Sequence, residues 1–122
     1  MKFKSTQVKG KGRGRLLGFP TINLQIPKDL ELLDGIYAVK VFIGDKVFIG
    51  ALHSGSVPTF KEFKKTLEVF LIDTKEEEIP YAKSFNIEII KHLRPVLNFP
   101  DQKRLTEQMT KDVEEAKSIV KL

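Results

Sequence analysis

A short segment near the N-terminus combines glycines with basic side chains, a composition that suits phosphate binding. Within residues 9–18, the glycines are Gly10, Gly12, Gly14 and Gly18. Glycine lets the backbone come close to a ligand, and successive backbone N–H groups can then point at one anion. The spacing matches neither the P-loop nor the dinucleotide-binding fingerprint. The segment is therefore either a phosphate-binding loop, to which basic side chains such as Arg15 add charge, or a mobile basic turn.

The segment continues into a Pro-Thr-x-Asn sequence that offers two neutral oxygen ligands. Pro20 favours an extended chain at its own position and at the preceding residue. Thr21 and Asn23 are two residues apart, so in a strand their side chains emerge from the same face. A hydroxyl and an amide carbonyl suit Mg²⁺, which usually takes few protein ligands and completes its shell with phosphate and water. The pair is either a magnesium site or two ordinary solvent-facing strand residues.

Glu68 is an acidic residue within a stretch of apolar strand-forming residues. Alternation places it on the same face as Phe70 and Ile72. A carboxyl group in such surroundings suits general-base chemistry, because burial disfavours its charged form. The alternative is an acid near a strand edge, paired with Lys64 or Lys65.

The remaining candidates carry weaker signals. Arg94 precedes a proline and either meets a phosphate or pairs with a carboxylate. His53 and His92 stand alone in the sequence, so no zinc site is indicated. The chain has no cysteine, which removes disulfides and thiolate chemistry. Its formal net charge of +5 favours anionic partners without naming one.

Two kinds of hydrophobic periodicity predict the elements that must position these residues. Period-two patterns predict about six strands, located at 3–8, 21–26, the two arms of a hairpin within 34–55, 66–73 and 84–93. Gly44-Asp45 marks the hairpin turn. From Asp101, a plausible N-cap, apolar residues recur every three or four positions and predict a helix of about 20 residues. Antiparallel strands need their edges closed or covered. We therefore expect one mainly β domain over residues 1–122, a small antiparallel barrel with a C-terminal helix.

No targeting or membrane-spanning segment is visible. The N-terminal residues carry charge without an apolar core, so they do not form a signal peptide. No run reaches the roughly 18 apolar residues that a membrane span requires. The sequence thus predicts a cytoplasmic protein that does not act on membranes.

The order of these motifs resembles the riboflavin kinase (flavokinase) family over nearly the whole chain. The resemblance is most specific at Gly14-Arg15, at Gly18-Phe19-Pro20-Thr21-x-Asn23 and at Glu68. Asp34-Gly35-Ile36-Tyr37-Ala38 and the segment HLRPVLNF around Arg94 add to it. It implies a six-stranded Greek-key barrel with a C-terminal helix. It also implies transfer of the γ-phosphate of ATP to the terminal ribityl hydroxyl of riboflavin, which yields FMN and ADP.

The resemblance further implies roles for individual residues. Thr21 and Asn23 would hold Mg²⁺, and Glu68 would be the catalytic base. Residues that bind the phosphates or the flavin are expected at Gly10, Gly12, Gly14, Arg15, Gly18, Pro20 and Arg94. The expected partners are ATP and riboflavin, and the chain is expected to act as a monomeric, stand-alone kinase domain.

The chain departs from the family pattern at several positions, which keeps other hypotheses open. The departures are at His53, Val57, Phe70, Ala82 and Val96. One alternative is a catalytically weakened or inactive flavin- or nucleotide-binding module of the same fold. Another is a basic barrel that binds single-stranded nucleic acid through interleaved aromatic and basic residues. We rank nucleic acid last, because most phenylalanines fall at alternating strand positions that predict a role in the core.

Overall fold

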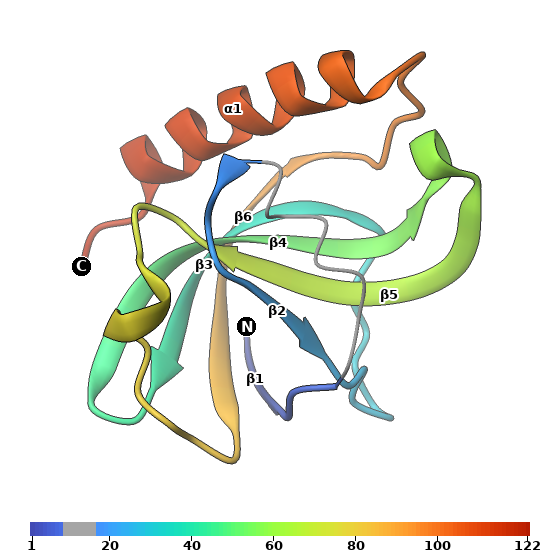
Figure 1. Ribbon diagram of the computed structural model, residues 1–122. Coiled ribbons are helices and arrows are strands. Elements are labelled where there is room, and N and C mark those ends of the chain that lie inside the picture. Colours follow the sequence, from blue (N-terminus) through green and yellow to red (C-terminus); the bar gives the residue numbers. More distant parts are fainter. Residues whose placement is uncertain (9–16) are drawn as a thin grey trace.

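The computed structural model describes residues 1–8 and 17–122, and six strands and one α-helix lie within them (Figure 1). The elements are β1 (Lys2–Ser5), β2 (Thr21–Leu24), β3 (Gly35–Ile43), β4 (Lys46–Val57), β5 (Glu62–Leu71), β6 (Phe85–Arg94) and α1 (Gln102–Ile119). Two short 3-10 turns, Pro58–Phe60 and Glu76–Glu78, follow β4 and β5. No helix among the described residues has the length and apolar character needed to cross a bilayer.

The strands form one antiparallel sheet with Greek-key connections. Their order is β1-β6-β3-β4-β5-β2. Strands β3, β4 and β5 follow one another as hairpins, and β6 returns to lie beside β3, which is the Greek-key arrangement. The expected six-stranded antiparallel Greek-key fold with a C-terminal helix is confirmed.

The two edge strands of this sheet meet, so the sheet curves into a half-barrel instead of leaving both edges open. A bridge joins Gln7 to Leu24. Backbone hydrogen bonds run from Val8 N to Asn23 O and from Gln25 N to Thr6 O, each 2.8 Å long. The N-terminal strand predicted at 3–8 therefore ends as β1 at Ser5, because the chain then leaves β6 and pairs with β2.

The hairpin between β3 and β4 turns where the sequence indicates. Ile43 pairs with Lys46, which leaves two residues in the turn. The first of them, Gly44, has a φ of 57°. Positive φ at this position is what a type II′ hairpin turn needs and what glycine adopts without strain.

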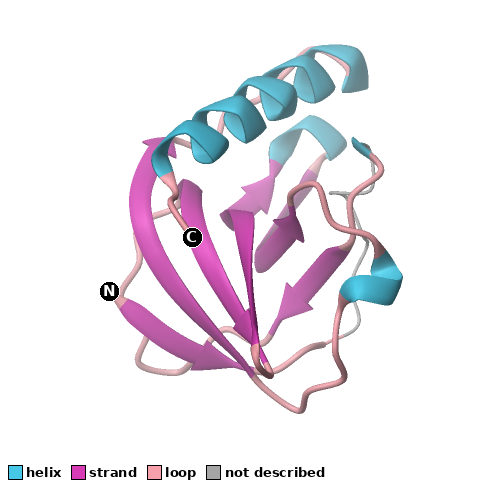
Figure 2. Cartoon of the chain, turned by 90° about the vertical axis from the view of Figure 1, so that its left-hand side faces the viewer, coloured by secondary structure: helices cyan, strands magenta, loops and turns pink. Residues whose placement is uncertain are grey.

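The core has two layers, one on each face of the sheet. On β5, Leu67, Val69 and Leu71 point into the barrel, whereas Phe70 and Ile72 belong to the cluster on the outer face. The apolar stripe of α1 packs against that outer face (Figures 1 and 2). The residues of this stripe are Leu105, Met109, Val113 and Ala116, as the helical periodicity predicted.

The helix begins where expected. The side chain of Asp101 accepts a hydrogen bond from Arg104 N at 2.9 Å, which satisfies one of the free N–H groups of the first turn. Pro100 precedes it, and the helix ends at Ile119. The predicted N-cap is confirmed.

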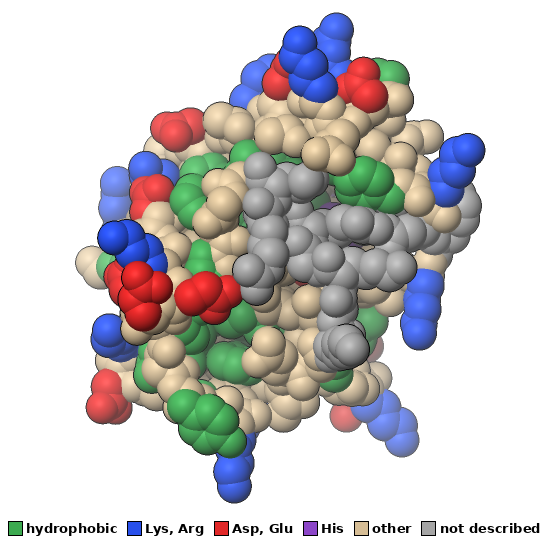
Figure 3. Space-filling model, in the orientation of Figure 1, with side chains coloured by type: hydrophobic (Ala, Val, Ile, Leu, Met, Phe, Trp, Pro, Cys, Tyr) green, Lys and Arg blue, Asp and Glu red, His purple; other side chains and the backbone are tan. Residues whose placement is uncertain are grey.

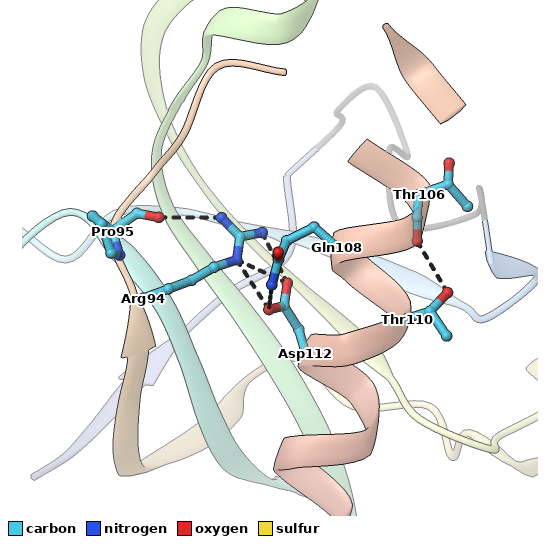
Figure 4. Close-up of polar contacts among 6 residues, drawn as sticks. All are labelled: Arg94, Pro95, Thr106, Gln108, Thr110 and Asp112. Carbon is cyan, nitrogen blue, oxygen red and sulfur yellow. Dashed lines mark hydrogen bonds and ion pairs between the residues drawn. The ribbon is translucent and has the colours of Figure 1, made fainter. Parts of the chain in front are cut away.

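A buried ion pair joins α1 to the end of β6 (Figure 4). Arg94 donates from Nε and Nη2 to the carboxylate of Asp112, at 2.9 and 2.8 Å. Gln108 donates to the same carboxylate at 3.1 Å. The two charged side chains are only 12% and 3% exposed, so each charge depends on the other for its solvation.

Removal of Asp112 should therefore destabilise the fold. We expect Asp112→Ala to lower the free energy of unfolding by about 3 kcal/mol, because it leaves the Arg94 guanidinium buried without its counter-charge. Chemical denaturation followed by circular dichroism measures this loss. Lys117→Ala is the matched control, since Lys117 pairs with Asp73 at the surface and exposed pairs contribute little. Equal midpoints for the two variants would contradict the role given to the buried pair.

Candidate functional site

Three polar residues from three neighbouring strands lie in one row across the sheet. Asn23 on β2 is the cross-strand partner of Glu68 on β5. Glu68 is in turn the partner of His53 on β4. Cross-strand partners point to the same face, with Cβ atoms roughly 5 Å apart. The fold thus brings together Asn23, Glu68 and His53, which are far apart in the chain; we call these three the polar row.

Thr21 lies two residues before Asn23 on β2, so its side chain is on the same face as the polar row. Its cross-strand partner is Phe70. The residue is 8% exposed, and its Oγ1 has no hydrogen-bond partner among the described residues. A buried hydroxyl without a partner loses about 1–3 kcal/mol of solvation, so it is a position at which a bound ligand is favourable.

The donor set of this face fits Mg²⁺. No group of three or more His, Cys, Asp or Glu among the described residues is arranged to hold a metal by itself. A metal here would instead take the unpartnered Thr21 Oγ1 and the Asn23 amide oxygen, together with phosphate oxygens and water, which is the manner in which Mg²⁺ usually binds. Thr21 and Asn23 share a face as the sequence predicted, and their role toward a metal stays a prediction.

Glu68 lies on β5, between the edge strand β2 and β4, and it has a cross-strand partner on each side. It is 7% exposed, and Phe70 on the same face is 8% exposed. Lys65 is one of the two lysines that the sequence offered as a partner of Glu68. Its Nζ forms an ion pair with Asp34 Oδ1 at 3.1 Å. The dry surroundings expected from the alternation pattern are therefore present.

Hollows lie along β2 on both sides of this face. A cavity of about 510 Å³ is lined by Asn23 and Glu68 together with Gln25, Lys64 and Thr66. A smaller one of about 190 Å³ is lined by Thr21 and Pro20 together with Glu76 and Tyr81. The two candidate metal ligands thus line different hollows.

The end of the glycine-rich segment enters the site at Gly18 and Pro20. Gly18 has a φ of +79°, and no atom lies within 4 Å of where its Cβ would stand. Glycine is therefore needed there for backbone conformation and not for space. Both residues line a hollow of about 430 Å³ with Thr74 and Lys75. The other predicted residues of the segment lie outside the described residues: Gly10, Gly12, Gly14 and Arg15.

Arg94 meets a carboxylate, one of the two partners that the sequence left open. Its guanidinium is held by Asp112 and also donates to the Pro95 carbonyl at 3.1 Å. It lies over the ring of Phe99, 5.6 Å from the ring centroid. Arg94 thus anchors the start of the segment that follows β6, and its predicted contact with a flavin stays a prediction.

His53 belongs to the site, although no predicted role falls on it. Its Nδ1 is buried and has no hydrogen-bond partner among the described residues. Burial is the largest effect on the pKa of His53 and lowers it. A hydrogen bond with the Ser56 backbone acts in the opposite direction, and the smaller effects of Arg94 and Asp34 lower and raise the pKa, respectively. The only signal in the sequence was its position two residues after Ala51 in a predicted strand, which places both on one face. The structure shows that this is the outer face. The strand partner of His53, however, is set only by the tertiary fold.

Known proteins resemble this chain in sequence and in structure. A bifunctional riboflavin kinase/FMN adenylyltransferase from Haemophilus influenzae is 33% identical over 112 residues, which cover 91% of this chain and 36% of that protein. An RNA-binding riboflavin kinase RibR from Bacillus subtilis is 35% identical over 109 residues, covering 88% of this chain and 46% of that protein. This chain therefore spans less than half the length of either relative.

A solved structure described as a macrolide-efflux protein from Streptococcus pneumoniae has the same fold. It matches with a TM-score of 0.77 at 25% identity, over 95% of this chain and 38% of that one. Most directly, the model of the riboflavin kinase family, Flavokinase, matches residues 1–120. With this match over almost its whole length, and with its Greek-key sheet, the chain belongs to the riboflavin kinase family.

Proposed function

We propose that the chain phosphorylates riboflavin to FMN, with ATP as the phosphoryl donor and Mg²⁺ as the metal. Membership of the riboflavin kinase family supports the overall reaction. The observation that carries the proposal is the placement of Glu68 directly opposite Asn23, with the unpartnered Thr21 hydroxyl on the same face. Glu68 thus lies one strand spacing from Asn23, and Thr21 is its diagonal neighbour, roughly 7–8 Å away.

Phosphoryl transfer requires little covalent chemistry from the protein itself. Phosphoryl transfer depends mainly on position and on charge stabilisation. The Glu68 carboxylate accepts the proton of the ribityl hydroxyl while that oxygen bonds to the γ-phosphorus and the bond to the ADP oxygen breaks. Bound Mg²⁺ supplies charge neutralisation at the phosphates, and Thr21 and Asn23 are the residues that would hold it. The low exposure of Glu68 keeps water, the competing nucleophile, away from the base.

The alternative of an inactive flavin-binding module makes a different prediction, since it binds flavin without turnover. Of the departures from the family pattern, Phe70 lies on the site face, 6.4 Å from the ring of Phe19, where it packs the outer layer of the core. None of the departures replaces Thr21, Asn23 or Glu68. We therefore favour an active kinase.

Nucleic-acid binding stays the least favoured hypothesis. On the face shown in Figure 3, the described Lys and Arg side chains are scattered around the margin, with acidic side chains among them. A surface that follows a nucleic-acid backbone needs a continuous positive groove with aromatic platforms. We propose a soluble, monomeric kinase domain that acts on small molecules.

Replacement of the base tests the proposal. We expect Glu68→Gln to lower the rate of FMN formation by about 10²–10⁴-fold, because the amide cannot accept the proton. Chromatography of reactions with riboflavin, ATP and Mg²⁺ measures FMN. Glu88→Gln is the matched control, a strand glutamate opposite Lys2 and Lys40 on β1 and β3, away from the polar row. No FMN from the wild-type chain, with flavin fluorescence still quenched, would favour the inactive module instead.

The candidate metal ligand gives an independent test. We expect Thr21→Val to raise the Mg²⁺ concentration for half-maximal rate by about tenfold, in line with the loss of a group that supports a metal site. Its melting temperature should not fall, because the removed hydroxyl has no hydrogen-bond partner in residues 1–8 and 17–122. Thr110→Val on the exposed face of α1 should leave the Mg²⁺ dependence unchanged (Figure 4). An unaltered Mg²⁺ dependence in Thr21→Val would exclude that residue as a ligand.

A further inference from the structure

The position of His53 within the polar row assigns it to one side of the reaction. Asn23, Glu68 and His53 lie on β2, β5 and β4, which are successive neighbours in the sheet. Neighbouring strands are about 4.8 Å apart, so His53 lies one spacing beyond Glu68 and two beyond Asn23. If phosphate and metal lie at Asn23 and the reacting hydroxyl lies at Glu68, then His53 faces the remainder of the acceptor molecule.

Unsatisfied polar atoms support a ligand at this position. Among the described residues, three buried side-chain atoms have no hydrogen-bond partner: Thr21 Oγ1, His53 Nδ1 and Ser54 Oγ. Thr21 and His53 point to the same face of the sheet, at either side of Glu68. Ser54 is the next residue on β4 and points to the opposite face, and nothing in the structure explains its hydroxyl.

The protonation state of His53 suits a hydrogen bond with a neutral group. Burial is the largest effect on the pKa of His53 and lowers it, against a hydrogen bond with the Ser56 backbone, while Arg94 and Asp34 have smaller, opposite effects. The imidazole is therefore neutral near pH 7 and presents one N–H donor and one acceptor nitrogen. A hydroxyl group, which both donates and accepts, can satisfy Nδ1 in either tautomer.

We propose that His53 binds the acceptor, with its buried Nδ1 hydrogen-bonded to a second hydroxyl of a polyhydroxylated chain whose terminal hydroxyl lies at Glu68. The inference rests on the proposed function and adds a residue that recognises the chain of the acceptor, not its ring system. A kinase with such a contact selects acceptors that carry more than one hydroxyl, because a chain without it leaves Nδ1 buried and unpaired.

Binding measurements test this contact without turnover. Titrations monitored by flavin fluorescence, with Mg²⁺ and ADP present, give the Kd for riboflavin and for lumiflavin, which has the same ring system with a methyl group in place of the ribityl chain. We expect His53→Leu to raise the Kd for riboflavin by about tenfold and to leave the Kd for lumiflavin unchanged, as the loss of one hydrogen bond predicts. His53→Gln, which keeps a donor and an acceptor, should retain most of the preference for riboflavin.

His92→Gln is the matched control, since His92 is an exposed histidine of the same sheet that contacts the ring of Tyr37. Thermal melting of each variant establishes that it is folded, and His53→Phe, which also lacks both hydrogen-bonding groups, carries the test if His53→Leu does not fold. Equal loss of affinity for both flavins would overturn the proposal, because it would place His53 at the ring system or in the fold alone. An unchanged Kd with a lower kcat and a shifted pH profile would also overturn it, in favour of a proton-transfer role. Absence of FMN from the wild-type chain refutes the proposed function, whereas these Kd ratios judge His53 separately.

Discussion

The register of β2, β5 and β4 is the constraint on which the candidate site depends. Cross-strand partners share a face, so the pairing of Glu68 with both Asn23 and His53 decides that the three side chains meet. A slip of one residue would turn Glu68 to the other face. Both faces of β5 are buried, with Val69 inside the barrel and Phe70 in the outer layer, so such a slip would exchange the two layers of the core. Packing therefore fixes the strand register, and the register fixes the relative positions of Asn23, Glu68 and His53.

The helix covers the outer face of the sheet and keeps water away from the border of the candidate site. Its packing excludes water from the outer face at Ala38, Ala51 and Phe70, which lie in one row across the sheet. The polar row lies two residues farther along the strands on the same face. At this border, Asn23 and Glu68 line the cavity of about 510 Å³ and Thr21 lines the one of about 190 Å³. The ion pair between Arg94 and α1 attaches the segment after β6 to this layer, and the hydrogen bond from Phe99 N to Thr59 Oγ1, 3.0 Å long, attaches it to the turn after β4.

Two buried polar atoms on the site face, Thr21 Oγ1 and His53 Nδ1, contribute no hydrogen bond to the described part of the fold. Thr21 Oγ1 and His53 Nδ1 are buried without a partner among the described residues, and a fold selected only for stability has no reason for this, because each atom loses its hydrogen bonds to water. Replacement of such groups by apolar ones would be neutral or stabilising. In the proposed function, the metal and the acceptor would supply the missing partners of these atoms, which lie on either side of Glu68.

The sequence by itself determined the local elements, because strands and helices impose periods of two and of about 3.6 on apolar residues. It therefore predicted the six strands, the cap at Asp101 and the shared face of Thr21 and Asn23. It did not predict where the strand pairing of β1 ends, nor that Arg94 pairs with a helix residue. Those features, and the meeting of Glu68 with His53, depend on contacts between residues distant in the chain. Local periodicity carries no information on which strands become neighbours, so only the tertiary structure decided them.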